Sequence, residues 1–306
     1  VGASIGLNLL LHIPLLAAMG ITAVLTYAIL GLQQRGFRGM ELVIGAMVGT
    51  IALCYVAELF IAPIDWHAVA QHTVVPHLAD GGAVMLAVGI VGATVMPHAI
   101  YLHSGLTQDR LPTADPALRR RLIRLSDREV MMALGVAGLV NMAMLSVAAA
   151  VFHDGVHDSV ADIGAAYHTL TPLLGSAAAA LFLLSLLASG LSSSVVGTMA
   201  GQVIMQGFLG FRVPLWLRRA VTMAPAFAVV GLGADPTAAL VSSQVVLSLV
   251  LPVPLLALIV FSCRRDLMGA HALRGPPLVV AGGAGLVITA LNLILLAEQA
   301  GLSLFG

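Results

Sequence analysis

The residues best suited to chemistry lie close together in one apolar stretch, within the segment Gly92–His98 (GATVMPH). Pro97 has no N–H, and its ring clashes with the carbonyl four residues back, which belongs to Ala93. In hydrocarbon, a carbonyl without its helical donor is tolerated only where it lines a cavity or finds another partner. Met96 brings a thioether to roughly the same helical face. The two groups could form half of a cation site, although a proline kink with Met96 as a packing residue explains the same pattern.

Other polar side chains in the apolar stretches are few, and each allows two interpretations. His98 and His103 could titrate near physiological pH or simply hydrogen bond to nearby backbone. Gln244 lies roughly 9 Å into a later stretch if that stretch is helical, where it could act as a ligand or bond to another helix. Glu58 stands near the exit of its stretch, and we expect it to be hydrated there.

Eight apolar stretches must position these residues. Each approaches the length of about 20 residues that a helix needs to cross the hydrocarbon of a bilayer. They lie at residues 14–33, 42–63, 82–105, 129–152, 172–195, 217–234, 238–262 and 277–297. The sixth is the weakest, because it is short and contains Pro225. The uncharged run from Gly164 to Phe211 is too long for one crossing, and we expect it to break within Ser192–Gly197.

Composition excludes several classes of protein. Of 306 residues, 59% are hydrophobic and 9% are charged, and the mean hydropathy is +1.03, whereas a soluble domain has about 25% charged residues. The 14 basic residues balance 14 acidic ones, so no basic surface for nucleic acid is expected. Cys54 and Cys263 match neither a disulfide framework nor a zinc motif. No zinc-protease, serine-hydrolase or P-loop motif is present, so we expect no enzyme.

The arginines indicate the orientation in the membrane. All of them lie in the connections after the first, third, fifth and seventh stretches or at the edges of those connections. The positive-inside rule places such connections in the cytoplasm, so the connections around 65–80 and 153–168 face outward. The first stretch then runs from outside to inside. At least one earlier span should therefore precede Val1, and an odd number of spans if the true N-terminus is cytoplasmic. Residues 1–11 are apolar and should be the end of the last of these helices.

Histidines and aspartates gather in the two outward connections. We expect them to be solvated loop residues without fixed geometry, although they could concentrate cations near an entrance. They are His67, His72, His77, His153, His157 and His168, with Asp65, Asp80, Asp154, Asp158 and Asp162.

The segment Val91–Arg110 (VGATVMPHAIYLHSGLTQDR) closely resembles the sixth-helix motif of the Nramp family of proton-coupled divalent metal transporters. Gly6–Leu16, Leu186–Leu209 and Ser242–Leu258 are similar to the family's third-to-fourth helix passage, its eighth helix and its tenth helix. The resemblance implies one all-α transmembrane transport domain over residues 1–306, with a LeuT-like inverted-repeat fold that lacks its first helices. Residues 1–12 would end helix three, 13–80 would form helices four and five, and 81–298 helices six to eleven.

The resemblance also implies roles for individual residues. The Ala93 carbonyl and the Met96 sulfur match metal ligands of helix six, and Gln244 matches a helix-ten glutamine that can join the coordination shell. His98 and His103 match histidines along the proton or exit route. Asn141 would be a polar second-shell residue on helix seven. The family's Asp-Pro-Gly-x-Asn motif of helix one would precede Val1, so the chain alone should form an incomplete, neutral part of the site.

These expectations combine into one function. We expect uptake of Mn²⁺ or Fe²⁺ with protons into the cytoplasm by alternating access, in the inner membrane of a bacterium, with no other cofactor. The partners would be divalent metal ions, protons, the lipid bilayer and the missing N-terminal helices, and not nucleic acid. The Met96 thioether would favour transition metals over Ca²⁺ and Mg²⁺. The alternatives are a passive divalent cation channel and a membrane scaffold that transports nothing.

Overall fold

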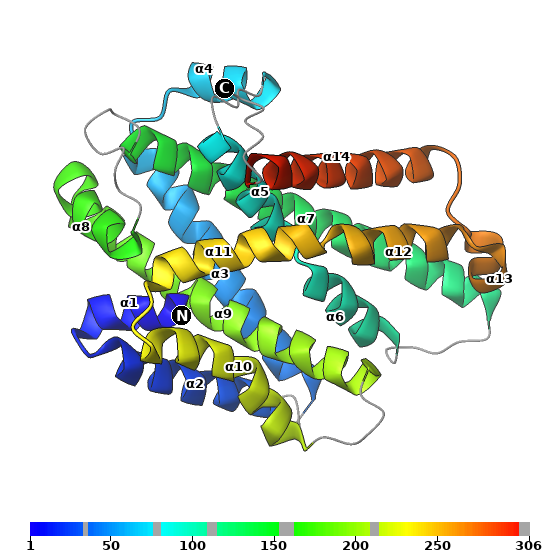
Figure 1. Cartoon of the computed structure of the whole chain (residues 1–306), viewed down its shortest axis with the longest axis horizontal. Coiled ribbons are helices and arrows are strands. Elements are labelled where there is room, and N and C mark those ends of the chain that lie inside the picture. The colour runs from blue at the N-terminus through cyan, green and yellow to red at the C-terminus, as the bar shows by residue number, and fades with distance from the viewer. Residues whose placement is uncertain (33–35, 76–80, 109–114, 153–161, 209–213, 300–306) are drawn as a thin grey trace. The chain divides into compact units, whose positions relative to one another are not determined.

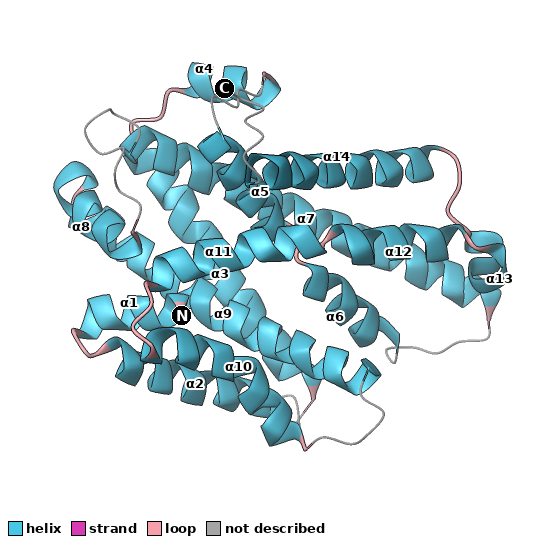
Figure 2. Cartoon of the chain, in the orientation of Figure 1, coloured by secondary structure: helices cyan, strands magenta, loops and turns pink. Residues whose placement is uncertain are grey.

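The computed structural model describes residues 1–32, 36–75, 81–108, 115–152, 162–208 and 214–299, and nearly all of them are helical (Figure 1, Figure 2). The helices are α1 (Gly2–Leu11), α2 (Leu15–Leu32), α3 (Phe37–Ile61), α4 (Trp66–Val74), α5 (Gly81–Thr94), α6 (Pro97–Gln108), α7 (Pro116–Phe152), α8 (Ile163–Leu174), α9 (Ser176–Phe208), α10 (Leu215–Gly231), α11 (Pro236–Val250), α12 (Pro252–Cys263), α13 (Arg265–Met268) and α14 (Pro276–Gln299), with the 3₁₀ turn η2 (Gly269–His271). The all-α class predicted from the sequence is therefore confirmed.

Seven helical segments of the described chain are long and apolar enough to cross a membrane. They are Leu15–Leu32, Arg38–Ile61, Gly82–Thr107, Ala117–Phe152, Ser176–Gly207, Pro236–Cys263 and Pro276–Ala297. They coincide with seven of the eight predicted stretches, and the remaining stretch, 217–234, is helix α10, which has 17 residues and contains Pro225. The chain is a multi-pass membrane protein.

The chain divides into two compact units, of which the first comprises residues 1–74 and 105–235. Its central helix is α9, which packs against α1, α2, α3, α8 and α10, as Figure 1 shows for α1, α9 and α10. Small residues allow these close contacts. A Cβ atom on Gly190 of α9 would overlap with the backbone nitrogen of Ala3 and lie 2.7 Å from its Cα atom. Glycine at this position therefore lets α1 and α9 touch backbone to backbone.

The short helix α10 is attached to α2 through a buried arginine. Arg219 is 5% exposed, donates a hydrogen bond from Nη2 to the Leu30 carbonyl at 3.2 Å, and lies 5.6 Å from the centre of the Tyr27 ring. The Tyr27 hydroxyl donates in turn to the Trp216 carbonyl at 2.9 Å. These contacts hold in place the helix that hydrophobicity marks least clearly.

The long uncharged run breaks at Gly175, and our expectation of a break within Ser192–Gly197 is wrong. Gly175 has a φ of 90°, a conformation that favours glycine, and it separates α8 from α9. The serines do not interrupt α9, because the hydroxyls of Ser192 and Ser194 donate to the carbonyls of Ser189 and Gly190 within the same helix. Helix α9 therefore continues for 33 residues.

The second unit comprises residues 75–104 and 236–306. In its described part, α5 packs against α11 and α14, and α12 packs against α14. The core between these helices consists of Val84, Val88, Val245 and Leu295. This three-helix contact carries the segment that the sequence singles out for chemistry.

Candidate metal site

The predicted interruption of the third apolar stretch is present in the structure. Helix α5 ends at Thr94 and α6 begins at Pro97, with Val95 and Met96 outside both helices. The Val95 N–H still donates to the Val91 carbonyl at 2.8 Å. In a continuous helix the donor to the Ala93 carbonyl would be the residue at position 97, and proline there has none. The last helical hydrogen bond that the structure shows before the break is therefore accepted two residues before Ala93, by Val91.

The end of α5 is electrostatically suited to a cation. The last carbonyls of a helix have no helical donors and carry the negative end of the helix dipole. Ala93 is exposed and Met96 is half-buried, so neither group is sealed in a packed core. An oxygen and a polarisable sulfur are therefore available within three residues of each other.

Helix α11 comes very close to α5 one residue before Ala93. A Cβ atom on Gly92 would overlap with the Gln244 carbonyl oxygen and lie 2.9 Å from the Ser248 Cβ atom. One turn earlier, a Cβ atom on Gly89 would make only an ordinary contact, 3.8 Å from Val245. Glycine at position 92 thus allows Gln244 to lie beside the break. The structure therefore places Gln244, a ligand candidate from the sequence, next to the segment Gly92–His98.

The Gln244 side chain has an unused acceptor. Its Oε1 atom is buried and has no hydrogen-bond partner among the described residues, while its Nε2 donates only a long bond of 3.4 Å to the Ser243 hydroxyl. A buried amide oxygen without a partner is unfavourable. A cation beside α5 would remove this cost, which favours the interpretation of Gln244 as a ligand over that of a helix-to-helix hydrogen bonder.

A buried polar pair behind Gln244 was missed by the sequence reasoning. Ser248 donates from its hydroxyl to Asn292 Oδ1 at 3.1 Å, and Asn292 Nδ2 donates to the Ser248 carbonyl at 2.7 Å. The two residues are 1% and 3% exposed and join α11 to α14 one turn after Gln244. The available signal was an asparagine within the apolar stretch 277–297, together with a serine four residues after Gln244.

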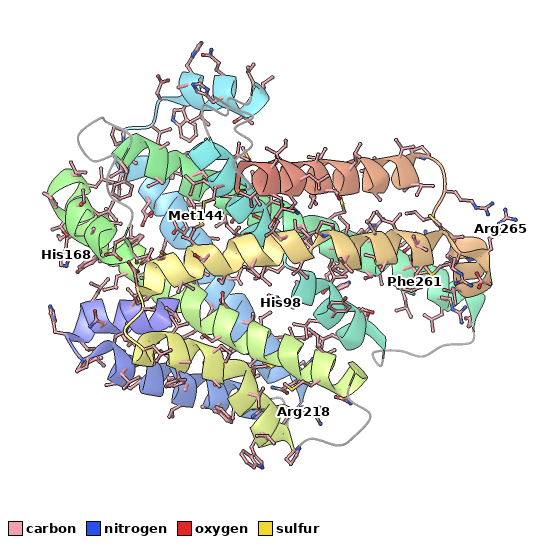
Figure 3. All side chains as sticks on the ribbon, viewed as in Figure 1. His98, Met144, His168, Arg218, Phe261 and Arg265 are labelled. Carbon is pink, nitrogen blue, oxygen red and sulfur yellow. The ribbon has the colours of Figure 1, made fainter. Side chains whose placement is uncertain are left out.

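The remaining predicted residues are placed less specifically. His98 is the second residue of α6 and is half-buried, and Figure 3 shows it at the start of that helix. His103 is exposed on α6. Asn141 lies on α7 in the first unit. Their roles, and those of the ligands, stay predictions. Within the described residues, no group of three or more His, Cys, Asp or Glu side chains could hold a metal ion.

The outward connections show local roles where the structure describes them. Asp65 accepts from the backbone nitrogens of His67 and Ala68, and Asp162 accepts from Ala165 N at the start of α8. His72 and His168 are exposed. Six of the predicted loop residues lie outside the described ranges: His77, Asp80, His153, Asp154, His157 and Asp158.

The sequence led us to expect a hydrated Glu58 at the end of its span. This expectation is wrong. Only 2% of the Glu58 surface is exposed, and Leu59 and Ala62, which follow it at the end of α3, belong to one apolar cluster with Ala179 and Phe182 of α9. Its Oε1 atom is buried without a hydrogen-bond partner. A buried acid is therefore present in the first unit, where the sequence indicated a solvated one.

Comparison with known proteins identifies relatives over the whole chain. Residues 1–298 match the family model for Nramp, described as natural resistance-associated macrophage protein-like. The chain is 61% identical over 302 residues to the divalent metal cation transporter MntH of Acidiphilium cryptum, covering 99% of this chain and 70% of that protein. It is 58% identical over 291 residues to MntH of Burkholderia ambifaria, covering 95% of this chain and 66% of that protein.

Solved structures agree with these relatives. The crystal structure of the Eremococcus coleocola manganese transporter in complex with an aromatic bis-isothiourea substituted compound superposes with a TM-score of 0.80 at 32% sequence identity. The match covers 97% of this chain and 67% of that one. The chain thus spans about two thirds of the length of the relatives it matches.

Proposed function

Because the chain belongs to the Nramp family, we propose that it forms most of a proton-coupled transporter that carries divalent transition metal ions, Mn²⁺ and Fe²⁺, into the cytoplasm by alternating access. The names of its relatives describe divalent metal cation transporters and a manganese transporter, and none of these names describes an enzyme. The observation that carries the proposal is the break between α5 and α6, with the unpartnered Gln244 oxygen on the helix that touches it.

Three neutral donors would bind the transported ion from this chain. The Ala93 carbonyl and the Gln244 amide supply oxygen, and Met96 supplies a thioether. A thioether binds transition metals better than Ca²⁺ or Mg²⁺, which prefer shells of oxygen alone. Neutral donors do not offset the charge of a divalent cation, so the acidic and amide ligands expected from the family's first helix would complete the shell.

Protons would use the histidines that follow the break. His98 and His103 both lie on α6, and an imidazole changes its charge within the physiological range of pH. A discontinuous helix suits alternating access, because the two halves can tilt separately about the residues that hold the ion. Asn141 would support the site from α7 in the second shell.

Uptake of Mn²⁺ into liposomes that contain the full-length protein tests the ligand role of Gln244. Replacing Gln244 by Ala removes the unpartnered oxygen, and we expect metal affinity to fall about tenfold, equivalent to about 1.4 kcal/mol. Gln206→Ala is the matched control, because Gln206 is exposed on α9 and its Oε1 atom accepts a long hydrogen bond of 3.4 Å from Arg218. Equal affinity in Gln244→Ala and the unmodified protein would contradict the assignment.

The same liposomes distinguish the rival classes. A carrier coupled to protons takes up Mn²⁺ faster when the outside is more acidic than the inside. A passive channel would give a metal flux indifferent to the imposed pH gradient, and a scaffold would bind no metal by calorimetry.

A further inference from the structure

Glu58 is an acid buried in the first unit that the proposed metal site does not use. It lies on α3, one turn before the helix ends at Ile61, and 2% of its surface is exposed. Its Oε1 atom has no hydrogen-bond partner among the described residues. The carboxyl group is therefore enclosed by protein, although the aqueous phase begins only about one helical turn away.

In the described structure, the helices around Glu58 place no basic side chain near its carboxyl group. Helix α9 contains no ionisable residue over its whole length, Ser176–Phe208, and α7 contains none after Glu129. The only ionisable side chain of α2 is Tyr27. On α3 itself, the nearest basic residue is Arg38, about 30 Å away along the helix. Glu58 thus has no ion-pair partner on any of the helices that pack against α3.

The titratable neighbours of Glu58 are neutral groups. Cys54 and Tyr55 stand one turn earlier on α3, and both are buried. On α8, Tyr167 packs against the apolar cluster at the end of α3, and His168 is exposed. Within the described part of the chain, a carboxylate at this position would have no counter-charge on the helices around it, and its Oε1 atom would have no hydrogen bond.

We propose that Glu58 is a proton-binding site that carries its proton as a neutral acid while α3 and α9 are packed together, and that it releases the proton only when these helices part enough to admit water. An unpaired charge is strongly unfavourable both in a protein interior and in the hydrocarbon of a membrane. On release, the O–H bond breaks, the electron pair stays on the carboxylate oxygen, and the proton passes to water. The inference goes beyond the proposed function, because it requires no metal and holds whether or not transport is coupled to protons.

Infrared spectroscopy of the full-length protein in a detergent without ester groups tests the protonation. A protonated carboxyl group has a C=O stretching band that a carboxylate lacks. We expect this band to persist at neutral pH, where an exposed glutamate is ionised, and to vanish completely in Glu58→Gln. Glu41→Gln is the matched control, because Glu41 is exposed on the same helix, and it should leave the band unchanged. A band that is missing at neutral pH, or that survives in Glu58→Gln, would overturn the proposal.

The thiol of Cys54 can be used to detect the separation of α3 and α9. Cys54 is 3% exposed one turn from Glu58, whereas Cys263 at the end of α12 is half-buried. Labelling with a membrane-permeant maleimide, quantified for each cysteine peptide by mass spectrometry, gives a ratio of Cys54 to Cys263 modification. Cys263 serves as the internal reference for labelling efficiency, and comparison with Glu58→Gln separates the contribution of Glu58 from the pH response of the thiols themselves.

The proposal predicts how this ratio depends on pH. Opening that releases one proton becomes more frequent by up to about tenfold per pH unit, so the ratio should rise more steeply with pH in the unmodified protein than in Glu58→Gln. A constant ratio in the unmodified protein, or the same rise in Glu58→Gln, would contradict it. Should Glu58→Gln fail to fold, a constant ratio or a missing infrared band in the unmodified protein still overturns the proposal, whereas a rising ratio together with the band supports it.

Discussion

Met96 is the residue on which discrimination between metals is predicted to depend. Replacing it by Ala removes the thioether and keeps the carbonyl of Ala93 and the amide of Gln244. We expect Mn²⁺ uptake to continue and the preference for Mn²⁺ over Ca²⁺ to fall by about tenfold, since the remaining donors are oxygens that suit Ca²⁺. Competition between the two ions for uptake into liposomes measures this preference.

The control for this substitution is Met144→Ala. Met144 lies on α7 and is 40% exposed (Figure 3), so its loss should change neither uptake nor preference. Unchanged exclusion of Ca²⁺ in Met96→Ala would show that the sulfur is not the selective ligand.

The buried Oε1 atoms of Gln244 and Glu58, which have no hydrogen-bond partner among the described residues, show how far the environment of a single residue can be predicted from sequence. The sequence indicated Gln244 as a possible ligand because its position in an apolar stretch makes its amide costly. It indicated the opposite environment for Glu58, because nearness to the end of a span suggests water. The burial of Glu58 comes from α9, more than a hundred residues further along the chain, and no local pattern around residue 58 contains that information.

The positions where helices break also show which features a local sequence pattern can predict and which depend on tertiary structure. The break after Thr94 was predictable because the missing N–H of Pro97 acts on its own helix. The serines at 192–194 suggested a second break, but their hydroxyls bond to the preceding turn of α9 and leave the helix intact. Gly175 ends α8 with a positive φ. Its sequence context differs little from that of Gly190 and Gly197, both of which continue the helix.

The contact between α5 and α11 can be tested with two glycines of one helix. In Gly92→Ala the new methyl group overlaps with the Gln244 carbonyl and crowds Ser248, so the helices must separate. We expect a loss of about 2 kcal/mol of stability, typical of an overpacked core, together with a loss of Mn²⁺ binding. Thermal unfolding in detergent and calorimetry measure the two effects.

Gly89→Ala is the matched control on the same helix, because its methyl group meets Val245 at 3.8 Å. It should bind Mn²⁺ normally and unfold at the same temperature or slightly higher, since alanine favours helix formation. If both variants behaved alike, the close approach at Gly92 would not be what places Gln244 beside the break.

At the scale of the whole molecule, composition and charge gave the most secure predictions. The low content of charged residues required a membrane protein, and the seven long apolar helices follow the predicted stretches. The α5–α6 break and the contact with α11 lie within one compact unit, so the structure can relate Ala93 to Gln244. Asn141 belongs to the other unit. Its role depends on an arrangement that neither residue spacing nor local packing determines, and it therefore stays a prediction.

Proton coupling belongs to the whole transporter, and the histidines of α6 provide its test. We expect His98→Gln and His103→Gln to bind Mn²⁺ with nearly unchanged affinity, because neither residue is among the predicted ligands. Their uptake should respond several-fold less to an imposed pH gradient, because glutamine takes up no proton in the range where histidine does. His72→Gln on α4, an exposed histidine, should behave like the unmodified protein. A loss of Mn²⁺ affinity that is equal in both α6 variants would instead place these histidines at the metal, and the proton route would have to lie elsewhere in the protein.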